Sequence, residues 1–324
     1  MIPTNMAKPI KVRRITLSVF LLLWGGLLTV RQAAGFRQQA AALKVAVHLV
    51  ALNVTVLDQK GRAVPNLQKE DFKIYEDDIE QPISFFAPER VPVSWGLILD
   101  RSGSMEDMIG DVREAGFQAV AEMSPRDDMF VLLFNDRAEL VSDLVTDRDL
   151  LGNSISHLEA EGGTALYDAA ISALEHADHA RNQRKVIVIV TDGQDENSRL
   201  RFDDLLDRVM QAHEISVYPV GLFASARRPW WDRSKFPTEI AVEQNLKRLA
   251  EISGTHAYFP KNREECRRAI QAIARDVRGQ YSLSYYPVNR DWNGRWRTIR
   301  MEVFHHGKKD NALLTHTRAG YYAQ

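Results

Sequence analysis

Five side chains with oxygen donors stand where apolar runs end or where a helical pattern begins. They are Asp100, Ser102, Ser104, Thr164 and Asp192. The first three follow the apolar run 95–99, the fourth follows two glycines, and the last follows the apolar run 186–190. Ligand sites of open α/β sheets lie beyond the carboxyl ends of the strands, so we expect these loops to meet at one edge of a sheet.

These residue types predict a metal site with oxygen ligands only. Alternate residues of an extended loop lie on one side, so Asp100, Ser102 and Ser104 are expected to converge. Carboxylate and hydroxyl oxygens suit a hard divalent cation. We expect Mg²⁺, with Mn²⁺ or Ca²⁺ as alternatives, and we expect Thr164 and Asp192 to add the remaining donors.

Each of the three segments also has a simpler interpretation when it is taken alone. Ser104 and Asp107 have the spacing of a helix cap, and Thr164 also has the position of a cap. Residues 191–193 have the composition of an ordinary turn after a strand. The metal site is favoured because all three segments occur in one chain, each at an expected edge of the sheet.

Alternating strand and helix patterns from residue 91 onward predict the elements that hold these loops. Strands are expected at 95–99, 130–134, 185–190 and 216–220, and helices at 108–123, 147–158, 166–180, 203–213, 240–252 and 264–277. Short and almost wholly apolar strands are typical of a parallel sheet that is covered on both faces. We therefore predict an α/β fold with a doubly wound, mostly parallel, Rossmann-like sheet.

Strand patterns without helices flank this unit on both sides. They cover 44–90 before it and 279–324 after it, with three expected strands in each. Three strands are few for an independent sheet core. We predict that the two segments pair as one β-sandwich, into which the α/β unit is inserted. Two separate terminal sheets packed on the α/β unit are the alternative.

The first 36 residues resemble an export signal. Basic residues precede an apolar run at 15–30, and small residues follow it at 33–35. The run is shorter than the roughly 20 residues that usually span a membrane. We expect an exported protein (periplasmic, cell-surface or secreted), or one anchored in the inner membrane if residues 1–36 are not cleaved. The membrane would then be contacted only through this segment.

Composition narrows the classes of partner. Lys and Arg number 42 against 43 Asp and Glu, which gives a formal net charge of −1. This balance does not favour nucleic acid. The only cysteine is Cys266, so no disulfide forms within the chain.

Residues 100–105, 163–168 and 190–193 resemble the metal-ion-dependent adhesion site of the von Willebrand factor type A domain. The resemblance covers about 91–277, and we assign 91–278 to such a domain. Residues 61–72 and 319–322 are similar to bacterial secreted proteins described as VWFA-related. The resemblance implies that the five oxygen donors named above bind the cation directly or through water.

The resemblance also implies a function in protein binding, or adhesion, in which an Asp or Glu carboxylate of the partner completes the coordination. Arg101 and Gly163, next to the ligands, are candidate partner contacts. Trp230 and Trp231, among cationic residues at 227–235, are further candidates, although they could instead pin a long loop onto the domain.

Two other functions compete with protein binding. A metal that only braces the loops would make this a structural module. A Mg²⁺-dependent hydrolase or phosphoryl-transfer enzyme would need a base near Asp100, and the nearest acidic residues in sequence are Glu161 and Asp168. Neither stands out as a base, so we predict no enzyme activity.

Overall fold

The computed structural model describes residues 48–59, 63–87, 91–212, 214–223, 237–305 and 308–323. The expected signal or anchor at 1–36 lies outside these residues, as do Trp230 and Trp231. Within the described ranges, no helix is both long enough and apolar enough to span a bilayer.

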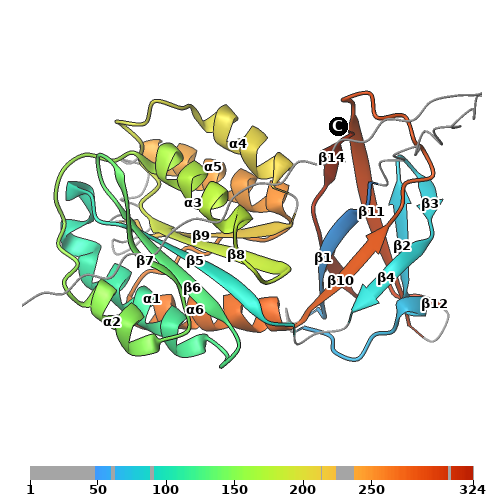
Figure 1. Ribbon diagram of the computed structural model, residues 1–324, viewed down its shortest axis with the longest axis horizontal. Helices are drawn as coiled ribbons and strands as arrows, with labels where there is room; N and C mark the ends of the chain where they lie inside the picture. The colour runs from blue at the N-terminus through green and yellow to red at the C-terminus, as the bar shows by residue number, and fades with distance from the viewer. Residues whose placement is uncertain are drawn as a thin grey trace, which may run out of the picture. The chain divides into compact units, whose positions relative to one another are not determined.

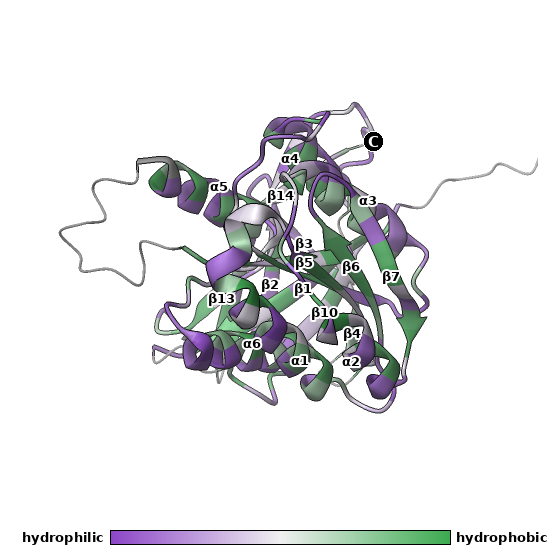
Figure 2. Ribbon diagram, turned by 90° about the vertical axis from the view of Figure 1, so that its left-hand side faces the viewer, coloured by the Kyte–Doolittle hydropathy of each residue, from purple (hydrophilic) through white to green (hydrophobic). Residues whose placement is uncertain are grey.

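A five-stranded sheet with the order β7-β6-β5-β8-β9 forms the centre of the α/β unit (Figure 1). Its strands are β5 (Val93–Asp100), β6 (Asp128–Phe134), β7 (Ala138–Val145), β8 (Arg184–Thr191) and β9 (Ile215–Gly221). All pair in parallel except β7, which is antiparallel to β6. Every residue of β5, β8 and β9 is buried, as a sheet covered on both faces requires. Figure 2 shows β5 and β6 in the green of hydrophobic residues. The predicted doubly wound, mostly parallel sheet is confirmed.

The edge strand β7 was not expected from the sequence. Most of its side chains are exposed or half-buried, and Glu139 and Asp143 interrupt any apolar run. An edge strand needs no continuous apolar pattern, so the signal that identified the central strands is absent here.

Among the described residues, six α-helices cover the two faces of this sheet (Figure 1). They are α1 (Ile109–Glu122), α2 (Arg148–Ser156), α3 (Leu166–Asp178), α4 (Phe202–Gln211), α5 (Pro237–Ser253) and α6 (Arg263–Arg278). Helices α1, α2 and α6 contribute to one apolar core, and α3, α4 and α5 contribute to the core on the opposite face. All six helices were expected, but a 3₁₀ helix, η2 (Gly103–Met108), precedes α1.

The flanking strands form two antiparallel sheets that share one apolar core. One sheet has the order β13-β1-β10-β4, and the other has the order β12-β11-β2-β3, with β14 paired to β11. From the N-terminal segment come β1 (Val50–Leu57), β2 (Phe72–Glu76), β3 (Ile79–Gln81) and β4 (Ile83–Ala87), with a 3₁₀ turn, η1 (Lys69–Asp71), before β2. From the C-terminal segment come β10 (Gln280–Tyr285), β11 (Trp296–His305), β12 (Lys308–Lys309), β13 (Leu314–His316) and β14 (Gly320–Tyr322).

Both sheets mix strands from the two ends of the chain. Strand β1 pairs with β10 and β13, and β2 pairs with β11. The predicted β-sandwich built from the N- and C-terminal segments is therefore confirmed, and the alternative of two separate terminal sheets is wrong.

A buried ion pair joins the two segments inside the sandwich. Glu76 at the end of β2 and Arg297 of β11 lie 2.9 Å apart, and each is 2 % exposed. The hydroxyls of Tyr285 and Tyr321 donate to the second oxygen of Glu76, at 2.7 and 2.8 Å. The carboxylate is thus fully hydrogen-bonded, which burial of a charge requires.

Arg184, the first residue of β8, ties the α/β unit to the sandwich. Its buried guanidinium donates to the carbonyl oxygens of Val277 and Gln280 and to the hydroxyl of Ser282. These acceptors span the end of α6 and the start of β10, which only Gly279 separates. One side chain therefore fixes the junction at which the inserted unit returns to the sandwich.

Candidate metal centre

The carboxylate of Asp100 lies at the centre of the predicted site. Asp100 ends β5 and is fully buried. Its Oδ1 accepts from the backbone N–H of Ser102 at 2.9 Å and from the Ser102 hydroxyl at 2.6 Å. The hydroxyl oxygens of Ser102 and Ser104 lie 3.0 Å apart. The three residues expected to converge after β5 therefore do so, with Ser102 buried and Ser104 exposed.

Thr191 also belongs to this cluster, although sequence reasoning treated it only as part of a turn. It ends β8 and is fully buried. Its hydroxyl donates to Oδ2 of Asp100 at 2.6 Å and accepts from the backbone N–H of Gly193 at 2.9 Å. Thr191 therefore fixes the orientation of the Asp100 carboxylate from the neighbouring strand. The sequence signal was its position as the last residue of an apolar strand, next to Asp192.

Asp192 follows Thr191 and is 5 % exposed. Its carboxylate accepts from the backbone N–H of Gln194 at 3.0 Å and from the Gln194 side-chain amide at 2.8 Å. These hydrogen bonds are those of an ordinary turn after a strand, which is the alternative interpretation of residues 191–193. They nevertheless keep a second carboxylate close enough to Asp100 for the two charges to interact.

Burial raises the pKa of Asp100 to about 6. The hydrogen bonds from Ser102 and Thr191 act in the opposite direction, and the nearby charge of Asp192 raises the pKa further. A buried carboxylate beside a second carboxylate is an environment in which a bound cation would be favourable.

Backbone hydrogen bonds join the three loops of the site. The N–H of Gly103 donates to the carbonyl of Gly162 at 2.9 Å, and the N–H of Glu161 donates to the carbonyl of Arg101 at 2.8 Å. The carbonyl of Thr164 accepts from two N–H groups of the loop after Asp192, at 2.9 and 2.8 Å. Thr164 is 3 % exposed at the centre of this network. The structure therefore brings together the loops of all five predicted ligands.

The capping alternatives for Ser104 and Thr164 are not observed. The N-cap of α1 is Met108, and that of α3 is Ala165, and neither helix has a side-chain cap. The 3₁₀ helix η2 also begins without a side-chain hydrogen bond from its N-cap, Ser102. The hydroxyls are therefore not used to cap these helices.

The donor set fits a small, hard cation. Ligands of octahedral Mg²⁺ lie about 2.1 Å from the ion and therefore roughly 3.0 Å from each other. The hydroxyl oxygens of Ser102 and Ser104 are hydrogen-bonded at 3.0 Å, a separation that would also suit two ligands of one Mg²⁺ ion. Among the described residues, no group of three or more His, Cys, Asp or Glu side chains is placed to hold a metal. The site has two carboxylates, and its other donors are hydroxyls.

Arg101, a predicted partner contact, is engaged within the protein. Its guanidinium lies 2.7 Å from Glu161 and 3.4 Å from Glu139. Gly163, the other predicted contact at this edge, lies where an added Cβ would come within 2.4 Å of Asn197 and 2.6 Å of Asp136. Both residues therefore help to pack the loops around the site.

The two acidic residues considered as catalytic bases, Glu161 and Asp168, both have partners within the protein. Glu161 is exposed and paired with Arg101. Although burial acts to raise it, the pKa of Asp168 is lowered by hydrogen bonds from Arg199 and Leu200. Its carboxylate thus accepts hydrogen bonds from the loop before α4.

Strand β9 ends at the same edge of the sheet as the site. Strand β9 is parallel to β8, with Gly221 opposite Thr191, and the N–H of Leu222 donates to the Thr191 carbonyl at 2.8 Å. Trp230 and Trp231 lie outside the described residues.

Part of this chain matches a protein-family model, and several solved structures are similar to it. Residues 96–194 match the family model described as the von Willebrand factor type A domain. Among solved structures, the chain is similar to the vWF domain of the type V pili tip protein Mfa5 from Porphyromonas gingivalis. That similarity has 12 % identity and a TM-score of 0.48, over 58 % of this chain and 95 % of the other.

Two further solved structures are similar at the same level. A von Willebrand factor type A protein from Catenulispora acidiphila has 12 % identity and a TM-score of 0.48, over 85 % of this chain and 75 % of the other. The conserved hypothetical protein BatB from Bacteroides thetaiotaomicron has 17 % identity and a TM-score of 0.45, over 57 % and 98 %. No curated protein sequence matches this chain significantly.

Proposed function

The central α/β unit of this chain is a von Willebrand factor type A domain, and we propose that its carboxyl edge binds a divalent cation that captures a protein partner. The observation that carries this proposal is the oxygen cluster of the buried Asp100, Ser102 and Thr191 with the exposed Ser104, with Asp192 close by. Mg²⁺ is the proposed cation, and Mn²⁺ and Ca²⁺ are alternatives.

In this proposal the five predicted ligands hold the ion, directly or through water, and Thr191 orients Asp100. The bound cation would supply positive charge for a ligand that the domain does not provide itself. Two protein carboxylates leave a divalent ion able to attract another anion. The proposed partner group is therefore an Asp or Glu carboxylate.

We also propose that the protein is exported, because residues 1–36 have the pattern of a signal peptide or anchor. A partner outside the cytoplasm follows from this location. Mass determination of the N-terminus of the mature protein would distinguish cleavage from anchoring.

Calorimetric titration with Mg²⁺ and Mn²⁺ tests the metal site directly. The parent protein is expected to bind one ion, and Asp100→Asn is expected to lose binding while keeping the shape of the buried side chain. Ser104→Ala, which removes an exposed hydroxyl, should weaken binding without unfolding the protein. Ser84→Ala is the matched control, because Ser84 is an exposed serine of the sandwich.

Several results would separate the competing functions. Equal ion binding by the parent, Asp100→Asn and Ser104→Ala would refute the metal site. Ion binding that stabilises the fold, combined with partner capture that is the same in Mg²⁺ and in chelator, would instead support a metal that only braces the loops. Circular dichroism of each variant checks that the fold is retained.

A further inference from the structure

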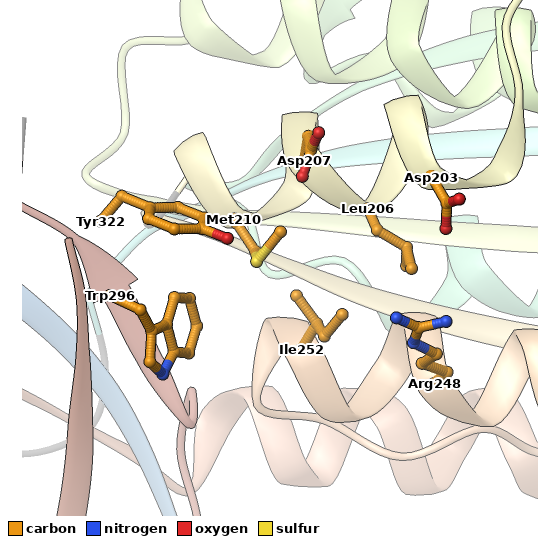
Figure 3. Close-up of a pocket in the computed structure, with 8 residues that line it drawn as sticks. All are labelled: Asp203, Leu206, Asp207, Met210, Arg248, Ile252, Trp296 and Tyr322. Carbon is orange, nitrogen blue, oxygen red and sulfur yellow. The ribbon is translucent and has the colours of Figure 1, made fainter. Parts of the chain in front are cut away.

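A pocket of about 380 Å³ lies away from the oxygen cluster, between helices α4 and α5 and the end of the sandwich (Figure 3). Its middle is apolar and is lined by Leu206 and Met210 of α4 and by Ile252 of α5. Trp296 and Tyr322 close one end, and Arg248 lies at the other end (Figure 3). The pocket therefore combines an apolar floor with aromatic and charged walls.

The aromatic wall is built by two strand ends of the sandwich. Trp296 begins β11 and Tyr322 ends β14, and the two residues are opposite each other in the antiparallel ladder. Their rings lie 5.2 Å apart at an interplanar angle of 72°, and the residues are 36 % and 39 % exposed. Two large rings thus remain partly open to solvent at the mouth of a pocket, where a cation can be attracted to their faces.

Helix α4 presents two carboxylates to this pocket, Asp203 and Asp207. They are four residues apart and so share one face of the helix, where like charges repel. Among the described residues neither has a hydrogen-bonding or ionic partner. The other charges of α4 do: Asp204 lies 3.8 Å from Arg201, and Arg208 pairs with Asp178.

On helix α5 as well, the charged side chain that lines the pocket is unpaired within the described ranges, whereas its neighbour is paired. Lys247 pairs with Glu243 at 2.7 Å, whereas the neighbouring Arg248, which lines the pocket, has no ionic partner among the described residues. Two carboxylates and one guanidinium give the pocket a formal charge of −1. An occupant of opposite charge is therefore favoured.

We propose that this pocket binds an Arg or Lys side chain of a protein partner, as a second contact that is separate from the metal edge. The aliphatic part of such a side chain would cover Leu206, Met210 and Ile252, as long basic side chains commonly do on apolar surfaces. Its charged group would lie by the faces of Trp296 and Tyr322, near Asp207, and away from Arg248. Arginine is the better fit, because its planar group also stacks on aromatic rings.

The proposal is tested by NMR titration of the full chain with N-acetyl-argininamide in chelator, while the indole N–H signal of Trp296 is followed. A Trp296→Phe variant assigns that signal. The neutral isostere N-acetyl-citrullinamide is the control ligand. Because the metal edge is not used, binding in chelator and in Asp100→Asn is expected to equal that of the parent, so failure here is distinguishable from failure of the metal site.

Three variants test how the charge of the pocket changes its affinity for the arginine probe. Asp207→Asn is expected to weaken binding of the arginine probe roughly two- to fivefold, as the loss of one partly exposed ion pair does. Arg248→Gln should strengthen it by a similar factor, because a repelling charge is removed. Asp149→Asn, an exposed carboxylate at the start of α2, should leave it unchanged.

Equal binding of the citrulline and arginine probes would overturn the proposal. So would an equal effect of Asp207→Asn and Asp149→Asn, weaker binding in Arg248→Gln, or a titration that leaves the Trp296 signal unmoved.

Discussion

Removal of the buried carboxylate of Glu76 is expected to destabilise the sandwich strongly. Glu76 accepts one hydrogen bond from Arg297 and two from tyrosine hydroxyls, and all of these groups are buried. In Glu76→Leu, Arg297 keeps the carbonyls of Asn289 and Asp291, at 2.8 and 2.6 Å, and the hydroxyl oxygen of Tyr321 at 3.4 Å, but its charge has no counter-ion.

The magnitude follows from these contacts. Breaking a buried ion pair by removing one partner costs about 3–5 kcal/mol. Each tyrosine hydroxyl left without an acceptor adds roughly 1–3 kcal/mol, although such costs overlap and do not simply add. We therefore expect Glu76→Leu to lower the free energy of unfolding by at least about 3 kcal/mol.

Urea unfolding of the full chain, followed by circular dichroism, measures this change. Glu80→Gln is the matched control, because Glu80 lies in the same sheet but is exposed, and exposed ion pairs contribute little. Its unfolding free energy should equal that of the parent. The double variant Glu76→Leu/Arg297→Met should be less destabilised than Glu76→Leu alone, since no unpaired charge stays buried.

A Glu76→Leu protein as stable as the parent would refute the reasoning. A double variant less stable than Glu76→Leu would also refute it, because the uncompensated charge would then not be the source of the cost.

Two further perturbations concern a glycine of the metal edge and a buried carboxylate of α6. Gly193 has a φ of +77°, and an added Cβ would lie 2.2 Å from Val242. Gly193→Ala should therefore lower the free energy of unfolding, measured by thermal melting, by more than about 2 kcal/mol. Gly294 has a φ of +72°, but an added Cβ would meet nothing within 4 Å, so Gly294→Ala should lower the free energy of unfolding by only about 1 kcal/mol. Equal losses in the two variants would contradict the predicted clash with Val242. Burial raises the pKa of Asp276 to about 6. Between about pH 4 and pH 6 the folded state therefore binds more protons than the unfolded state. This group contributes stability at low pH that is lost as pH rises through 6. Asp276→Asn should therefore have a free energy of unfolding about 1–3 kcal/mol higher than the parent at pH 7.5, and should lose this advantage near pH 4, as measured by urea unfolding at both pH values. The quantity to compare is the difference between the two proteins at each pH. Burial lowers the pKa values of the adjacent His256 and His316, and this opposes the pH trend in both proteins.

Much of the α/β unit could be predicted because its signals are local. The central strands are continuous apolar runs, and each run ends where side chains leave the covered sheet, so the polar residues at those ends mark the edge. Ser102 and Asp192 were identifiable for this reason. Strand β7 was not, because an exposed edge strand lacks an apolar run.

The sequence could not show how residues distant in the chain combine. Glu76 stands beside two aspartates and has the composition of a turn, yet it is buried because Arg297 and two tyrosines from the other end of the chain surround it. Likewise, the sequence does not show that Arg101 pairs with Glu161 and Glu139. In both cases the partners lie tens to hundreds of residues away, and only packing brings them together.

The sequence by itself determined the covered sheet, the helices on it and the oxygen-rich loops at its edge, since periodicity and residue type are properties of short segments. Tertiary structure alone decided the role of Thr191, whose hydroxyl reaches Asp100 from the adjacent strand. It also decided which strands of the two terminal segments pair, and it formed the pocket that joins α4 and α5 to Trp296 and Tyr322. The physical reason is the same throughout: these features depend on contacts between segments, and the pattern within one segment does not specify which other segment it will meet.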